Sequence, residues 1–182
     1  MHVNLEETAA LSQAAAVAEV EASMNVQSVM EKNVKFSGLQ DSLADVARVM
    51  GENDCGAVPI VDGERRVVGM VTDRDICLAM ATADRLPSKI PVRQVMSRKL
   101  FFCGPGDDVA DALQTMQKKK VRRLPVIAED GKLTGILSMD DVILHTESRK
   151  GKVAEIGYGD AVRALKAIYR RTPPKKEHTA QG

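Results

Sequence analysis

Two short segments of the chain combine a hydroxyl residue and a carboxylate at the same spacing. GMVTDRD contains Thr72 and Asp75, and 66 residues later GILSMDD contains Ser138 and Asp141. At the start of a helix this spacing is typical of a capping box, in which the hydroxyl and the acid each accept a hydrogen bond from a backbone N–H. An aspartate there can also accept from both hydroxyls of a ribose cis-diol. A structural cap and a ribose contact are both consistent with the pattern.

The residues around each pair favour a ligand. Gly69 and Gly135 begin the two segments inside predicted strands, where glycine often marks the close approach of a ligand or of another backbone. The helix N-terminus that follows has free N–H groups and the positive end of a dipole, which favour phosphate. Glycine, hydroxyl, helix start and aspartate together predict a ribose-phosphate corner in each copy.

The elements that position these residues also occur twice. A shift of 66 residues aligns 26–80 with 92–146, and 13 of the 55 aligned positions are identical. The paired methionines Met30 and Met96 are interpreted as core residues. A unit of this size cannot bury both faces of its sheet alone, so two units should pack against each other.

Each copy predicts the same order of elements. Residues 41–53 place apolar side chains on one helical face, and residues 109–116 repeat the pattern. AVPIV and VVGMVT, then LPVI and LTGILS, predict two hairpins, and DRDICLAMATAD and MDDVILHTESR predict a helix after each. The fold class is therefore mixed α/β, with two β-α-β-β-α units packed against each other.

The flanks differ from the repeat and from each other. We expect an acidic helical extension over 1–24, units at 25–86 and 87–148, and a basic helix and disordered tail over 149–182. The C-terminal helix is predicted at 160–171. Its apolar side is expected to contain the side chains Val162, Leu165, Ile168 and Tyr169.

Composition narrows the function classes. The net charge is +1, Trp is absent and aromatic residues make up 3% of the chain, so nucleic acid is disfavoured as a partner. No apolar run is long enough to span a bilayer, and Cys55, Cys77 and Cys103 lack metal-ligand spacing. We expect a cytoplasmic protein with no metal. No enzyme motif is present, so no catalytic residue is assigned.

The doubled signatures VPIVDGERRVVGMVTDRDI and LPVIAEDGKLTGILSMDDV resemble a pair of CBS (cystathionine β-synthase) domains, a Bateman module, over about residues 25–147. The resemblance implies two pseudo-twofold-related units packed sheet to sheet. It also implies a regulatory module whose clefts bind adenosine compounds. AMP, ADP or ATP is the expected ligand, with NAD and S-adenosylmethionine as alternatives. It also implies a homodimer acting on a partner protein whose identity the sequence does not give.

The resemblance assigns site residues to both copies. The ribose contacts fall on Thr72, Asp75, Ser138 and Asp141, as the spacing suggests. The segments that meet adenine fall at two equivalent places, with these members: Ala57, Val58 and Pro59 in the first copy, and Leu124 and Pro125 in the second.

Cations distinguish the two copies. Arg122 and Arg123 match a phosphate-binding pair of nucleotide-binding relatives and end a run of five cations in six residues, whereas the first copy has Gly56 and Ala57 there. Arginine presents a fork suited to phosphate oxygens, although an exposed or structural role stays open. Arg74, beside Asp75, is a further phosphate candidate.

Two phenylalanines depart from the family pattern. Phe36 and Phe102 stand where many members have threonine. They are expected either to pack in the core or to lie against adenine.

Three hypotheses therefore remain. The first is an adenine-nucleotide sensor, the second is a scaffold that binds no nucleotide, and the third, disfavoured one is a nucleic-acid-associated protein.

Overall fold

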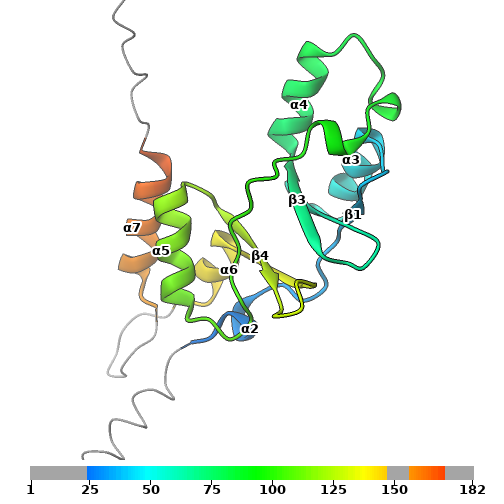
Figure 1. Cartoon of the computed structure of the whole chain (residues 1–182). Helices are drawn as coiled ribbons and strands as arrows, with labels where there is room; N and C mark the ends of the chain where they lie inside the picture. Colours follow the sequence, from blue (N-terminus) through cyan, green and yellow to red (C-terminus); the bar gives the residue numbers. More distant parts are fainter. Residues whose placement is uncertain (1–23, 147–155, 171–182) are drawn as a thin grey trace, which may run out of the picture.

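The computed structural model describes residues 24–146 and 156–170, and the predicted N-terminal helix and C-terminal tail lie outside these ranges. Figure 1 shows two halves, one with α3, α4, β1 and β3 and the other with α5, α6, α7 and β4. The fold class predicted from sequence, a mixed α/β pair of units, is confirmed. Within the described residues no helix is long and apolar enough to cross a membrane.

The first half contains a three-stranded sheet and two helices. The sheet order is β1-β2-β3, with β1 parallel to β2 and β2 antiparallel to β3. The elements, in chain order, are β1 (Ser37–Gly38), α3 (Leu43–Glu52), β2 (Ala57–Val61), β3 (Val67–Thr72) and α4 (Asp73–Thr82). The predicted hairpin and both predicted helices are present.

The second half repeats this order with a two-stranded antiparallel sheet. A single parallel bridge between Cys103 and Val126 stands where the first half has β1. The elements are α5 (Val109–Lys119), β4 (Arg123–Ile127), β5 (Leu133–Ser138) and α6 (Met139–Leu144). Equivalent helices begin at equivalent residues, because the apolar pattern that specifies them was duplicated.

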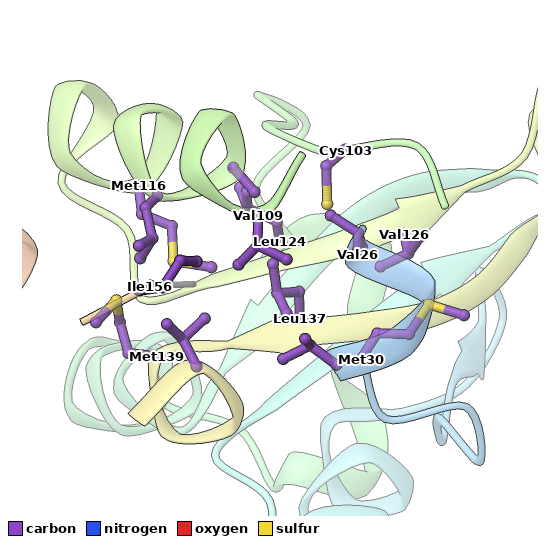
Figure 2. Packing of buried hydrophobic residues seen from close by; sticks show 14 of the residues in the cluster. Val26, Met30, Cys103, Val109, Met116, Leu124, Val126, Leu137, Met139 and Ile156 are labelled. Carbon is purple, nitrogen blue, oxygen red and sulfur yellow. The ribbon is translucent and has the colours of Figure 1, made fainter. Parts of the chain in front are cut away.

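The short segment that precedes each half in the sequence packs into the core of the other half. The short helix α2 (Val26–Val29) packs in the core of the second half, and Figure 2 shows Val26 and Met30 among Leu124, Val126 and Leu137 of β4 and β5. The linker between the halves contains the 3-10 turns η1 (Pro87–Lys89) and η2 (Val92–Gln94), and its Ile90, Val92 and Met96 complete the core of the first half. The chain therefore passes from one core to the other and back.

Equivalent backbone hydrogen bonds hold the two closing segments. Val26 N donates to the Asp107 carbonyl at 2.9 Å, and Val92 N donates to the Asp41 carbonyl at 2.8 Å. At the other end of each segment, Glu31 exchanges two bonds with Ile136 of β5, as Ser97 does with Met70 of β3. The duplication thus extends to the connections between the halves.

The strand glycines make this packing feasible. A Cβ on Gly69 would lie 2.7 Å from the Met96 Sδ, and one on Gly135 would lie 2.6 Å from the Met30 Sδ. Both contacts are far shorter than real Cβ contacts, so any side chain at these positions would displace the closing segment. Of the two alternatives predicted for these glycines, the close approach of another backbone is found, since the Cβ would also lie 3.1 Å from the Ser97 carbonyl oxygen at Gly69 and 2.9 Å from the Glu31 carbonyl oxygen at Gly135. The interpretation of Met30 and Met96 as core residues is confirmed.

Helix α7 (Tyr158–Tyr169) lies beside α5 on the second half (Figure 1). Its inner face consists of buried Ala161 and Ala164 with partly buried Leu165 and Ile168. The predicted apolar side is confirmed for Leu165 and Ile168, and it is wrong for Val162 and Tyr169, which are 47% and 61% exposed. Alanines allow the close approach to α5, and the sequence pattern overlooked them in favour of larger residues.

Candidate functional site

Both hydroxyl-carboxylate pairs form capping boxes. The Asp75 Oδ2 accepts from Thr72 N at 2.8 Å and from Thr72 Oγ1 at 2.7 Å, while Asp75 N donates to Thr72 Oγ1 at 3.3 Å. Asp141 Oδ2 accepts from Ser138 N at 2.7 Å and from Ser138 Oγ at 2.6 Å. The cap predicted for each pair is confirmed.

The caps leave one carboxylate oxygen unused in each pair. The Oδ1 atoms of Asp75 and Asp141 accept no hydrogen bond from the described part of the chain. A third capping box, Ser42 with Asp45, has the same geometry, but its Oδ1 lies 3.6 Å from Arg48. The structural role and a ligand contact are therefore compatible in the first two pairs, because they use different oxygens of one carboxylate.

The N-terminus of α4 is less available to a phosphate than the sequence suggested. Asp73 N donates to the Gly56 carbonyl, Arg74 N donates to Asp73 Oδ1, and Asp75 N donates to Thr72 Oγ1. These first-turn amides already have acceptors. A phosphate would therefore depend on side-chain cations.

Two clefts contain the unused oxygens. The Asp75 cleft is a cavity of about 580 Å³. Its lining combines the end of β3 and start of α4 with the linker, the start of β4 and the end of α7; the residues are Gly56, Ala57, Met70, Thr72, Asp73, Arg74, Asp75, Ser97, Lys99, Phe101, Lys120, Val121, Arg122, Arg123, Pro125, Ile168 and Tyr169.

The Asp141 cleft is its counterpart, with a volume of about 410 Å³. Its lining is Glu31, Asn33, Val34, Lys35, Asn53, Asp54, Cys55, Ala57, Arg123, Ile136, Ser138, Asp140 and Asp141. Ala57 and Arg123 line both clefts, and they occupy equivalent positions at the starts of β2 and β4. The two clefts therefore meet at this pair.

Charge separates the clefts. The Asp75 cleft is lined by five basic and two acidic side chains, whereas the Asp141 cleft has two basic and four acidic ones. Opposite charges within a few ångströms attract most strongly where water is excluded. An anionic group is thus favoured in the Asp75 cleft and disfavoured in the Asp141 cleft.

The structure brings many of the sequence-predicted site residues to the two clefts. Thr72, Asp75, Arg74, Arg122, Ala57, Arg123 and Pro125 line the Asp75 cleft, and Ser138, Asp141, Ala57 and Arg123 line the Asp141 cleft. Val58 and Leu124 are fully buried in the two cores, and Pro59 is buried in β2. These three line neither cleft, so their side chains are not positioned for a ligand there.

The phenylalanines lie differently from either expectation. Phe102 is 56% exposed and lines neither cleft, and Phe36 lines a separate hollow with Arg65 at 4.8 Å from the ring centroid. Phe101 instead lines the Asp75 cleft, and Lys119 lies 5.3 Å from its ring centroid. Phe101 packs in part against the core of the second half while its neighbour Phe102 is exposed, so a shift of one residue decides which ring meets the cleft.

The sequence analysis missed several residues that line the Asp75 cleft, among them Lys99, Phe101, Lys120 and Tyr169. Lys120 belongs to the run of five cations, which is typical of a solvated face, and Lys99 and Phe101 lie in a linker without periodicity. Tyr169 comes from outside the repeat. The self-alignment therefore gave no signal for these positions. The basic run was itself a signal for Lys120.

Cys103 is poorly suited to chemistry. It is buried, and burial, with a smaller contribution from Asp107, raises the pKa of its thiol to about 12. The thiolate is the nucleophile and metal ligand, so this group stays protonated at neutral pH. Over residues 24–146 and 156–170, no three His, Cys, Asp or Glu side chains come together as a metal site.

Comparison with protein families identifies the fold. The CBS domain model matches residues 26–82 and 92–147. The chain belongs to the CBS domain family and contains a tandem pair of these domains. Helix α7 lies beyond the matched residues.

Several proteins are similar over the same region. The chain is 31% identical over 117 residues to hypoxic response protein 1 of Mycobacterium tuberculosis, covering 64% of this chain and 81% of that protein. It is 31% identical over 126 residues to the CBS domain-containing protein YhcV of Bacillus subtilis, covering 69% and 88%. It is 28% identical over 121 residues to the uncharacterized protein MK0525 of Methanopyrus kandleri, and spans 62% of that protein's length and 66% of its own.

Solved structures give the same fold. CBS domain protein TA0289 of Thermoplasma acidophilum aligns with a TM-score of 0.67 at 19% identity, covering 82% of this chain and 78% of that one. Hypoxic response protein I, solved with two coordinated zinc ions, gives 0.63 at 29%, covering 68% and 100%. The CBS domain pair of protein MJ0100, solved with 5′-methylthioadenosine and S-adenosylmethionine, gives 0.61 at 21%, covering 67% and 94%.

Proposed function

We propose that this chain is a regulatory, non-catalytic module that binds AMP, ADP or ATP in the Asp75 cleft and acts on a partner protein. One observation carries the proposal: the unused oxygen of Asp75 and the guanidinium groups of Arg122 and Arg123 belong to one cleft. The carboxylate is an acceptor for ribose hydroxyls, and the arginines are donors for phosphate. Among the clefts described for this part of the chain, no other combines a carboxylate with an unused oxygen and a majority of basic side chains.

The dimensions of the cleft support a nucleotide. Small-molecule sites have volumes of about 300–1,000 Å³ with a few polar groups that fix orientation, and the Asp75 cleft has about 580 Å³. Pro125 and the Phe101 ring provide apolar surface for a base, and the ammonium groups of Lys99 and Lys119 lie 5.6 and 5.3 Å from the centroid of that ring. NAD is an alternative that also supplies ribose and phosphate.

The Asp141 cleft favours a second class of ligand. Its lining has four acidic and two basic side chains, so an adenosine without phosphate, such as S-adenosylmethionine, is the better match there. The structure of protein MJ0100 with S-adenosylmethionine and 5′-methylthioadenosine shows that such compounds bind one CBS domain pair. We propose this class for the Asp141 cleft as the second candidate.

Calorimetry tests binding directly. The panel is AMP, ADP, ATP, NAD, S-adenosylmethionine and unphosphorylated adenosine, with thermal unfolding measured in parallel. A ligand at 100 times its dissociation constant should stabilise the protein by about 2.7 kcal/mol. If no ligand at millimolar concentration gives heat or shifts unfolding, the proposal is wrong and the non-binding scaffold becomes the better hypothesis.

Three matched substitutions locate the ribose contact. In Asp75→Asn and Asp141→Asn the amide oxygen can still accept from the cap, but the unused acceptor becomes an NH₂ donor. Asp45→Asn makes the same change in a capping box outside the clefts and measures the cost to the cap together with an exposed ion pair to Arg48. We expect Asp75→Asn to weaken AMP binding while Asp45→Asn leaves it unchanged. Equal affinities in all three variants would rule out the ribose assignment.

We also propose that the module forms a homodimer through the outer face of α4. No α4 residue is buried, and Leu78 on its outer face is 53% exposed. Exposed apolar side chains on a helix are typical of an association surface when they cluster, and Leu86 nearby in sequence is 68% exposed. Sedimentation of the parent and of Leu78→Glu tests this, and a parent that sediments as a monomer overturns it.

A further inference from the structure

Helix α7 contributes to the ligand site although it lies outside both CBS domains. Ile168 and Tyr169, at the end of α7, line the Asp75 cleft. Ala161 and Ala164 of the same helix are buried, and Ala164 belongs to the core of the second half. The helix is thus held against the domain, and its last turn forms part of the cleft wall.

Two polar contacts join α7 to the cations of this cleft. Arg122 Nη1 donates to the Tyr169 hydroxyl at 3.2 Å, and Lys120 Nζ donates to the Arg170 carbonyl at 2.9 Å. The equivalent residues of the first half are 54–57. Some of them line the Asp141 cleft, and no α7 residue lines that cleft. The contacts therefore belong to the cleft where a phosphate is favoured.

We propose that Tyr169 is a positioning residue that orients Arg122 for a phosphate in the Asp75 cleft. Arginine has five N–H donors in a planar fork, so the bond to Tyr169 leaves the other donors available. Fixing a flexible side chain before binding reduces the entropy lost when the ligand arrives. This inference rests on the proposed function and adds to it a specific dependence on α7.

The arrangement also links phosphate binding to the docking of α7. If the docked helix orients Arg122, a ligand that uses the oriented guanidinium favours the docked helix by the same factor, because coupling between sites is reciprocal. AMP should therefore slow hydrogen exchange of the α7 amides. Adenosine, which lacks the phosphate, should slow it less.

The test compares Tyr169→Phe with Tyr158→Phe in the full chain. Tyr158 begins the same helix, is 56% exposed and lines neither cleft, so it controls for the loss of a tyrosine hydroxyl from α7. We expect Tyr169→Phe to weaken AMP binding about 2- to 10-fold, the effect of one hydrogen bond. Adenosine binding and the unfolding temperature should match those of Tyr158→Phe.

A double-mutant cycle with Arg122→Ala isolates the contact. In the Arg122→Ala background, Tyr169→Phe should no longer change AMP affinity. Equal AMP affinities of parent and Tyr169→Phe overturn the inference while leaving the proposed function standing, and so does an equal loss for AMP and adenosine, which indicates a structural role only. If the parent binds neither ligand, the proposed function fails and the inference fails with it.

Discussion

The Asp75 and Asp141 clefts have the same frame and different charge. In both, a capping box at the end of a strand holds a carboxylate with one oxygen unused, and the hydrogen-bond distances agree within 0.2 Å. The surrounding cations agree much less, since Arg122 faces the first cleft and its equivalent, Gly56, has no side chain. The duplication preserved what positions a ligand, and the charges diverged.

This difference gives one fold two clefts of opposite charge balance. The cap is required by the helix, because without it first-turn amides lose their acceptors. The cations differ between the two clefts while the cap geometry agrees, so the cap does not depend on them. Arg123 lies at the meeting point of both clefts, and it is the place where ligands in the two clefts would influence each other.

The largest predicted effect tests whether the two halves are closed in the same way. Met30→Ala and Met96→Ala each remove a buried side chain that fills the space above a strand glycine. Substitutions of this kind cost about 2–5 kcal/mol because a cavity remains. Denaturant unfolding should show a similar loss for both variants.

The control for this pair is Leu86→Ala, at a site that is 68% exposed, with an expected change within about 0.5 kcal/mol. If the free energy of unfolding falls by less than about 1 kcal/mol in only one methionine variant, that half tolerates an open core. The two closing segments would then be equivalent in geometry and not in stability.

The next effect separates the arginines. Arg122→Ala should weaken AMP binding at the Asp75 cleft about 10- to 100-fold, because hydrogen bonds to charged groups contribute about 1.5–3 kcal/mol. Arg123→Ala should affect ligands in both clefts, since Arg123 lines both. Calorimetry with AMP and S-adenosylmethionine measures each variant. An Arg123→Ala effect confined to AMP would mean that the clefts are independent.

Most of the frame of this site was accessible from the sequence. The period of the apolar residues predicts α3 and α5, and the spacing of Thr72 with Asp75 predicts the cap that is found. Such features are local, so a few neighbouring residues determine them. The duplication strengthened each prediction because every pattern occurred twice.

The parts that the sequence did not predict depend on tertiary contacts. Gly69 suggested the close approach of a ligand or of another backbone, and only the path of the linker reveals that Met96 and the Ser97 carbonyl occupy the space. Phe101 and Phe102 differ by one position in an extended segment, and only packing decides which ring faces the cleft. Tyr169 reaches the site because α7 docks on α5, a contact that no repeat encodes.

A smaller effect is expected from exchanging charges between the clefts. Asp54 and Lys120 are equivalent, and both have left-handed backbone at φ 48° and 56°, so each position tolerates the other's residue type in the same conformation. Asp54→Lys should strengthen AMP binding at the Asp141 cleft about 2- to 5-fold, and Lys120→Asp should weaken it at the Asp75 cleft by a similar factor.

Both changes in affinity should shrink at high salt, because ions screen exposed charges. Titrations at low and high ionic strength provide the check. An effect of Asp54→Lys that persists at 1 M salt, where the screening length is about 3 Å, would indicate a rearranged cleft and not a change in its charge.

The smallest effect concerns the buried thiol at the start of the second half. Because the pKa of Cys103 is raised from its ordinary 9.0 to about 12, the folded protein retains this proton while the unfolded chain releases it from about pH 9 upwards. The stability contributed by the protonated thiol is complete below pH 9 and is lost progressively up to about pH 12. Cys103→Ser introduces the residue type of the equivalent, also buried, Ser37. The free energy of unfolding, measured from pH 8 to 10.5, should therefore decline less steeply with pH in this variant. The difference in slope between parent and variant is the readout.

In the parent, iodoacetamide at neutral pH should label exposed Cys77 first and Cys103 last. Equal slopes together with rapid labelling of Cys103 would mean that this core opens readily, and that the second half is less firmly closed than the first.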